Sequence, residues 1–143
     1  MPKSQNTCNN LLALIYNATA WANIADNAAS SPITNIYVAL ATASYTTTST
    51  MATNEATYTN YVRQTVVRST SGWTAPATRA TANAAQITFP QCGVTGNTIT
   101  SAACGKATGA SDIFHYGDLN APIAVSNLIQ PIFAIGAITI TES

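Results

Sequence analysis

Hydrophobic residues near the N-terminus recur with the period of a helix. Apolar and small side chains lie three or four residues apart from Cys8 to Ala22, which predicts an amphipathic helix over residues 7–24. Asn6 or Thr7 can cap its first turn, because a short polar side chain accepts hydrogen bonds from the free backbone amides there. We therefore expect one N-terminal α-helix.

From residue 33 onward the pattern changes to that of β-strands. Residues 36–41 form a continuous apolar run of strand length, and residues 61–68 alternate with β-branched side chains that favour a pleated sheet. Further runs with strand character cover 87–90, 97–104, 112–117, 121–125 and 132–141. Turn-forming residues separate these runs at 106–111 and 118–122, whereas residues 73–85 fit no single element.

These runs together predict the fold and its core. Roughly seven to nine short strands after one helix are typical of a mainly β fold, here an antiparallel β-sandwich with jelly-roll-like connections. The length of 143 residues indicates a single domain, residues 1–143, with its strands in 33–143. The apolar side chains expected to be mostly buried are Ile36, Val38, Leu40, Val66, Ile87, Phe89, Ile99, Ile138 and Ile140.

Very few residues carry a charge. The chain has five basic and five acidic residues among 143, whereas about a quarter of the residues of a typical soluble domain are charged. Its 26 alanines and 23 threonines build a surface from methyl, hydroxyl and amide groups. A net charge near zero gives little repulsion between copies, so the composition favours a protein that packs against other subunits. The basic residues are scattered, which argues against a nucleic-acid partner.

The termini and cysteines indicate where the protein assembles. The N-terminal residues 1–5 are polar and lack the order of a signal peptide, and no apolar run reaches the roughly 18 residues of a membrane span. We therefore expect assembly in a cytosol and no membrane partner. In that reducing compartment Cys8, Cys92 and Cys104 are expected to be buried thiols, with a disulfide between Cys92 and Cys104 left open.

Few residues could carry out catalysis or bind a metal. A nucleophilic relay would need His115 with Asp112 or Asp118, but His115 and Asp118 point to opposite faces of a strand. Cys92, Cys104 and His115 lack the close paired spacing of a zinc site. No motif brings two of the five carboxylates together: Asp26, Glu55, Asp112, Asp118 and Glu142. The sequence therefore predicts a protein that is not an enzyme, with no catalytic, metal or cofactor site.

Aromatic side chains offer a different kind of site. An exposed tryptophan beside amides can bind a sugar, and Trp73 with Asn83 or Gln86 is the candidate for such a glycan platform. Packing in a core or an interface is the default role of these aromatic residues. A glycan-binding role is therefore kept only as an alternative.

Five segments, taken in order, resemble a family of small tailed-phage virion proteins. They read IYVALATA at 36–43, YVRQTV at 61–66, ITFP at 87–90, SDIFHYGDL at 111–119 and FAIGAITI at 133–140. The helical segment 11–16 also matches the family's opening, so the resemblance covers most of the chain. Two departures affect exposed loops: residues 99–110 lose the acidic residue of the family's hairpin, and Asn127-Leu128 replaces its usual Asn-Gly.

The resemblance implies a structural protein of the virion. Family members are described as tail fibre, minor tail or head decoration proteins, and head and tail locations both remain open. From the neutral surface we expect a capsid cement or decoration protein, partnered by the major capsid protein and by copies of itself as dimers or trimers. The alternatives are a tail or tail-fibre component and a carbohydrate-recognising, receptor-binding module. The N-terminal helix and the threonine-rich loop 44–59 are the segments expected to reach a neighbouring subunit.

Overall fold

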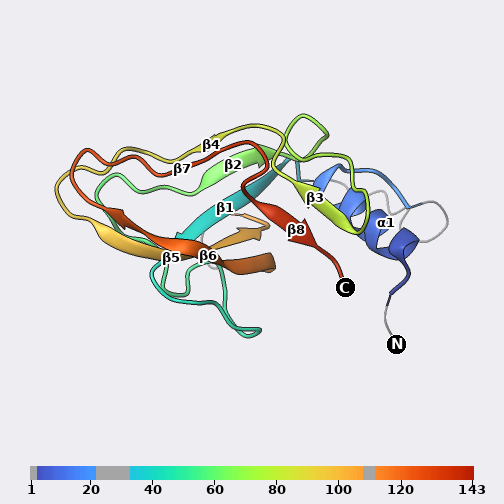
Figure 1. Cartoon of the computed structure of the whole chain (residues 1–143), viewed down its shortest axis with the longest axis horizontal. Helices are drawn as coiled ribbons and strands as arrows, with labels where there is room; N and C mark the ends of the chain where they lie inside the picture. The colour runs from blue at the N-terminus through green and yellow to red at the C-terminus, as the bar shows by residue number, and fades with distance from the viewer. Residues whose placement is uncertain (1–2, 22–32, 108–111) are drawn as a thin grey trace. The chain divides into compact units, whose positions relative to one another are not determined.

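The protein is mainly β, with antiparallel sheets and one helix near the N-terminus, as the sequence predicted (Figure 1). The computed structural model describes residues 3–21, 33–107 and 112–143. Its elements are α1 (Gln5–Tyr16), β1 (Asn35–Ala41), β2 (Gln64–Val67), β3 (Ala80–Ala82), β4 (Ile87–Thr88), β5 (Asn97–Gly105), β6 (Ile113–Val125), β7 (Ile132–Phe133) and β8 (Thr139–Thr141). This arrangement is consistent with the expected β-sandwich class.

Helix α1 is shorter than predicted. The Ser4 hydroxyl accepts a hydrogen bond from the Thr7 amide at 3.2 Å and caps the first turn. The helix ends at Tyr16 because Ala18 adopts a left-handed conformation with φ +54, and the Thr19 amide donates back to the Ala13 carbonyl at 3.1 Å. The predicted range 7–24 was therefore wrong at its C-terminal bound, and residues 22–24 lie outside the described residues.

The chain divides into two compact units. Unit 1 comprises residues 1–35, 66–87 and 133–143, and unit 2 comprises residues 36–65 and 88–132. The four-stranded sheet has the order β2-β1-β5-β6, and two smaller sheets pair β3 with β8 and β4 with β7. In unit 2 the register places Val38 of β1 opposite Cys104 of β5, and Cys104 opposite His115 of β6.

Two predictions were wrong in how they divided the chain into strands. Residues 113–117 and 121–125 belong to one strand, β6, so the predicted turn at 118–122 is absent. The pairing shifts from Ser101 opposite Asp118 to Ile99 opposite Ile123, and this bulge accommodates Pro122 in a strand at the edge of the sheet. The predicted strand 132–141 is divided into β7 and β8, because Gly136 adopts φ +75 in an intervening turn.

The predicted strands at 61–68 and 87–90 are shorter in the structure, where they correspond to β2 and β4. Two further predictions concern residues 73–85 and 106–111. The first region, which fitted no single element, contains β3. The predicted hairpin turn at 106–111 joins the antiparallel pair β5 and β6, and its residues 108–111 lie outside the described part of the chain.

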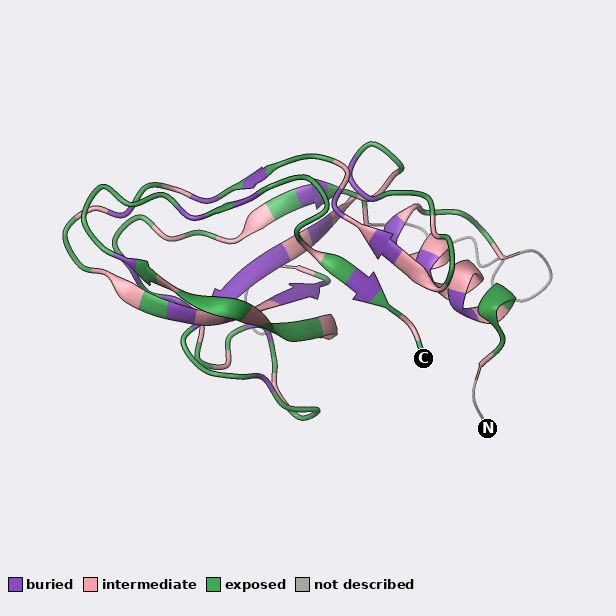
Figure 2. Ribbon diagram, viewed as in Figure 1, coloured by how far each residue is buried: buried purple, intermediate pink, exposed green. Residues whose placement is uncertain are grey.

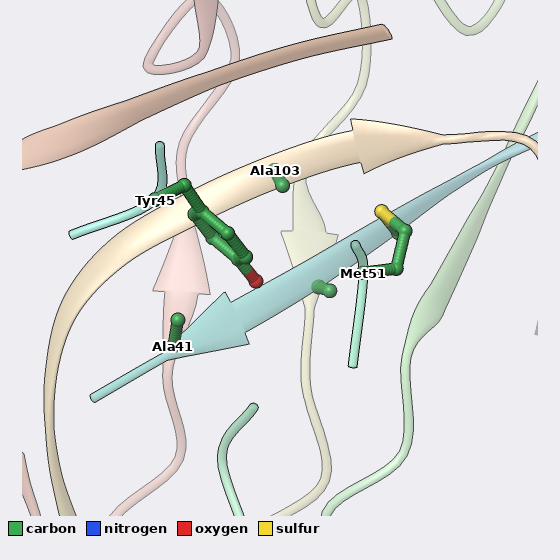
Figure 3. Packing of buried hydrophobic residues seen from close by; sticks show 5 residues of the cluster. Ala41, Tyr45, Met51 and Ala103 are labelled. Carbon is green, nitrogen blue, oxygen red and sulfur yellow. The ribbon is translucent and has the colours of Figure 1, made fainter. Parts of the chain in front are cut away.

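The predicted core is confirmed almost completely. Eight of the nine expected residues are buried, and only Ile138 is half-buried. Figure 2 shows strand β1 coloured as buried over most of its length. In unit 2, Tyr45 and Met51 pack with Ala39, Ala41 and Ala103 in one cluster (Figure 3). Tyr45 and Met51 come from the loop 44–59, so this loop folds back onto its own unit, and its residues 46–48 stay exposed. The apolar side chains of the loop join the core because their burial is favourable. The expectation that this loop reaches a neighbouring subunit stays a prediction, which concerns its exposed residues 46–48.

Candidate interaction surface

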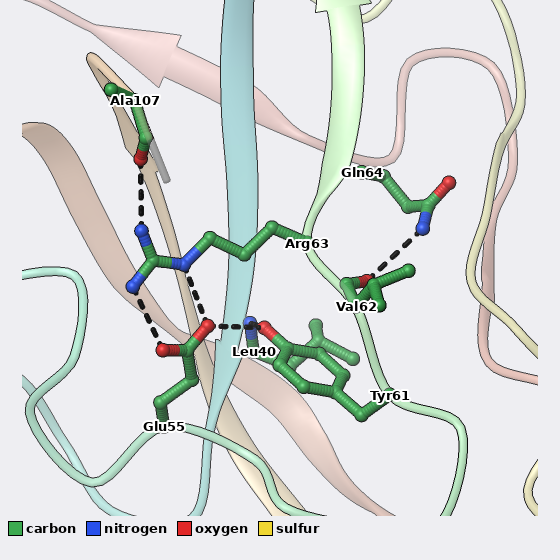
Figure 4. A network of polar contacts seen from close by, with 7 residues as sticks. All are labelled: Leu40, Glu55, Tyr61, Val62, Arg63, Gln64 and Ala107. Carbon is green, nitrogen blue, oxygen red and sulfur yellow. Dashed lines mark hydrogen bonds and ion pairs between the residues drawn. The ribbon is translucent and has the colours of Figure 1, made fainter. Parts of the chain in front are cut away.

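An ion pair fixes the loop 44–59 to the strand region of unit 2. Arg63 Nε and Nη2 donate to the two carboxylate oxygens of Glu55 at 2.6 and 2.8 Å, and Arg63 Nη1 donates to the Ala107 carbonyl at 2.8 Å (Figure 4). The Tyr61 hydroxyl donates to Glu55 at 3.0 Å and accepts from the Leu40 amide at 3.0 Å. We call Glu55, Tyr61 and Arg63 the clamp.

The clamp is built to hold the chain together. The Arg63 side chain is 6% exposed and that of Glu55 is 21% exposed. The hydrogen bonds to Glu55 raise the pKa of Arg63, and burial raises the pKa of the Tyr61 hydroxyl. The guanidinium is permanently charged and forms hydrogen bonds to both carboxylate oxygens, and the neighbouring phenol stays protonated. Such a group holds backbone segments in place and is poorly suited to proton transfer.

Other charged side chains also bind their own unit. In unit 1, Lys3 Nζ lies 2.6 Å from Glu142 Oε2. The Arg68 guanidinium donates to the carbonyls of Leu14, Ile15 and Ile33, and burial lowers the pKa of Arg68. In unit 2 the Asp118 carboxylate accepts from the Ser101 hydroxyl at 2.7 Å and the Ser44 hydroxyl at 3.0 Å, and these bonds lower the pKa of Asp118. The few charges of this chain therefore act mainly within it.

The residues weighed for catalysis or metal binding are dispersed. His115 lies in β6 opposite Cys104, and Asp118 lies three residues further along the same strand, bound by serine hydroxyls. Among residues 3–21, 33–107 and 112–143, no three His, Cys, Asp or Glu side chains gather as metal ligands would. All three cysteines are buried free thiols, as expected, and burial raises the pKa of Cys104 to about 12. Asp26 lies outside the described residues.

The structure contradicts the alternative of a glycan platform at Trp73 and agrees with the default role of core packing. Trp73 and Asn83 are fully buried in unit 1, whereas Gln86 is exposed. The Trp73 ring packs edge-on against Tyr16 with centroids 4.7 Å apart. Asn83 Nδ2 donates to the carbonyls of Ala85 and Ala134, and Asn83 Oδ1 accepts from the Ile138 amide, each at 2.8 Å. The indole is a core residue here, because covering its large apolar area stabilises the unit.

Three loops of unit 2 join into a surface without any charged residue. We define the loop tip as residues 59–60, 91–95 and 126–130, which contain none of the ten charged residues. Backbone hydrogen bonds connect the loops: Gly93 donates to Thr59 at 3.0 Å, and Cys92 donates to Ile129 at 2.9 Å. Figure 1 shows the segments before β5 and after β6 side by side at this end of unit 2.

The loop tip exposes large apolar side chains. Val94 is 86% exposed, Leu128 is 67% exposed and Ile129 is 43% exposed. They lie on two loops that are joined by the hydrogen bonds of Cys92, and the exposed amides Asn127 and Gln130 are the sequence neighbours of Leu128 and Ile129. The loop tip therefore combines exposed apolar side chains with neutral polar ones. Sequence reasoning noted the unusual Asn127-Leu128 pair as a change in exposed loop surface, but did not connect it with residues 91–95. Of the surfaces in the described residues, this is the one we take as the candidate interaction surface.

The fold and this surface are those of a β-rich structural protein that makes contacts through a neutral surface. The chain belongs to the family described as podophage GP4 fiber I protein gp80, whose family model matches residues 12–141. The expected resemblance to small tailed-phage virion proteins is thus confirmed, and the chain is a phage structural protein of the virion. Among curated proteins, none matches the chain. The described residues contain no helix capable of spanning a bilayer.

Proposed function

We propose that this protein is a structural component of a phage fibre, and that it acts by adhesion to other virion subunits rather than by chemistry. The observation that carries the proposal is the match of residues 12–141 to a family named for a fibre protein. The distribution of charge supports it. Six of the charged side chains bind partners within their own unit, which leaves neutral surface for contact.

A head-shell cement protein would use a similar neutral surface, and it was the first expectation from the sequence. The family description favours the fibre over the head, so we place the protein on the fibre and treat the head shell as an outcome of the test. Its partners are then copies of itself and the fibre or tail proteins beside it. Nucleic acid is not among the proposed partners, because the five basic residues are scattered along the sequence.

Electron cryo-microscopy of virions labelled with an antibody to this protein tests the location. Label on the fibre or tail, at a copy number far below that of the head subunits, supports the proposal. Label spread over the head shell would overturn the fibre assignment and restore the cement role. Absence of label from purified virions that carry their other structural proteins would overturn both.

A salt-wash series tests the mode of attachment. Apolar contacts survive screening, whereas exposed charge pairs weaken when the Debye length falls to about 3 Å near 1 M salt. We expect the protein to stay with pelleted virions through a molar-salt wash and to leave in denaturant, as seen by gel analysis. Release at a few hundred millimolar salt would show that charges hold it and would contradict the adhesive mechanism.

A further inference from the structure

The turn at residues 126–129 holds a leucine where a glycine is favoured. The Ile129 amide donates to the Ser126 carbonyl at 2.9 Å, which closes a four-residue turn, and Leu128 at its third position has φ +67. A turn with a positive φ at this position alone is the type that selects glycine or asparagine, because a Cβ atom is strained there.

Neighbouring loops keep Leu128 in this strained conformation. The Leu128 amide donates to the Cys92 carbonyl at 2.9 Å, and Gln91 Nε2 donates to the Leu128 carbonyl at 2.8 Å. Both backbone groups of Leu128 are therefore satisfied by residues 91–92. These two hydrogen bonds hold the backbone of Leu128 in the strained conformation and so fix the direction of its Cα–Cβ bond.

That side chain contributes little to its own unit. Leu128 is 67% exposed, and Val94, the most exposed large apolar residue described, lies on the loop to which Leu128 is bonded. In the isolated chain a glycine at 128 would relieve the strain and remove apolar surface from water. A leucine that is both strained and exposed becomes favourable when a partner covers it.

The charge of the surface indicates which partner. The loop tip has no charge, so an acidic or basic partner would lose hydration at its charged groups and gain no counter-charge. A second copy of this chain presents the same neutral surface and meets no like-charge repulsion. The exposed Asn127 amide can both donate and accept, so it can pair with its own copy across a symmetry axis. Gln130 Nε2 already donates to the Phe89 carbonyl at 3.0 Å, so Gln130 offers its side-chain oxygen as an acceptor.

We propose that the loop tip is a self-association surface, on which Leu128 and Val94 of one copy pack against the loop tip of a second copy. The proposal deepens the fibre role proposed above and rests on it for its setting in the virion. It names the residues through which the subunits would join.

Sedimentation velocity of the purified full chain over a range of concentrations tests the proposal. Leu128→Gly and Leu128→Asn both suit a positive φ and both remove the apolar side chain, so each is expected to fold and to weaken association at least tenfold. Val94→Ser is expected to weaken it in the same direction. Ile135→Ser, which changes a 70% exposed residue of unit 1, is the matched control and should leave association unchanged.

Three results would overturn the self-association surface: a wild-type chain that stays monomeric at a few hundred micromolar, Leu128 variants that associate like wild type, or a control variant that is equally impaired. The virion labelling described above separates this failure from failure of the fibre role. A chain that associates through the loop tip but is absent from virions refutes the fibre role alone, and a monomeric chain located on the fibre refutes only the self-association.

Discussion

Two tight turns, one in each unit, hold non-glycine residues in left-handed conformations. In unit 1, Ala77 and Ala80 exchange backbone hydrogen bonds of 2.9 and 3.0 Å around Thr78 at φ +49 and Arg79 at φ +67. In unit 2, the turn at 126–129 has Leu128 at φ +67. Both geometries normally select asparagine or glycine, and each such residue costs roughly 1–2 kcal/mol.

Hydrogen bonds hold both turns, and the turns differ in the side chains that they carry. In unit 1 the Arg79 amide donates to Asn9 Oδ1 at 2.7 Å and the Thr78 hydroxyl donates to the Ala77 carbonyl at 2.7 Å, and both strained residues have polar side chains. At Leu128 the backbone is satisfied, but the apolar side chain remains in solvent. Strain alone is therefore no sign of a contact surface, whereas strain that displays an apolar side chain is one.

The largest expected effect comes from breaking the clamp of unit 2, the unit that carries the loop tip. Arg63→Met leaves the mostly covered Glu55 carboxylate without its partner, and we expect a loss of about 3 kcal/mol in the free energy of unfolding by denaturant titration. The double variant Glu55→Gln with Arg63→Met removes the unpaired charge and should recover part of the loss. Equal stability of Arg63→Met and wild type would contradict the clamp.

Unit 1 should respond nearly as strongly at Asn83, which follows strand β3 and binds three backbone groups. Asn83→Leu keeps the branched shape but leaves those groups without their partner, at about 1–3 kcal/mol for each group that water does not reach. We expect a loss of about 2–3 kcal/mol in chemical denaturation. Asn120→Leu, at an exposed position of β6, is the matched control and should change stability by less than about 0.5 kcal/mol.

Variants that relieve the backbone strain at 78–79 and at 128 compare the two turns directly. Thr78→Asn with Arg79→Gly should raise the free energy of unfolding by about 1–2 kcal/mol and leave self-association unchanged. Leu128→Gly should raise it by at most about 1 kcal/mol and weaken self-association. Denaturant titration and sedimentation on the same samples measure both quantities. If the two variants affected association alike, the distinction between the turns would fail.

The smallest effect concerns Asp118, whose exposed carboxylate is bound by Ser101 and Ser44. Because these bonds lower its pKa below the ordinary 3.8, they stabilise the folded state at pH values above 3.8. That contribution is lost as the pH falls from 3.8 through the lowered pKa of the folded state. Asp118→Asn should flatten the pH dependence of stability in this acidic range, and an unchanged dependence would exclude the Asp118 contribution.

Local pattern was sufficient for some elements and insufficient for others. The apolar run 36–41 that became β1 and the predicted strand 97–104 that became β5 were predicted closely, because burial of one or both faces leaves a direct trace in the sequence. The helix was predicted too long, because small residues after Tyr16 continue the helical period although Ala18 ends the helix. The turn predicted at 118–122 became a bulge, because pairing with β5 outweighed the local preference of its residues.

The sequence by itself determined the mainly β class, most of the core, the scarcity of charge and the family to which the chain belongs. Only the tertiary structure decided where those few charges lie, that Trp73 is buried, and that residues 91–95 and 126–130 form one surface. The physical reason is the distance along the sequence over which each effect acts. Period, propensity and composition act between neighbours in sequence, whereas an ion pair such as Glu55 with Arg63 or a shared surface depends on which distant segments the sheets bring together.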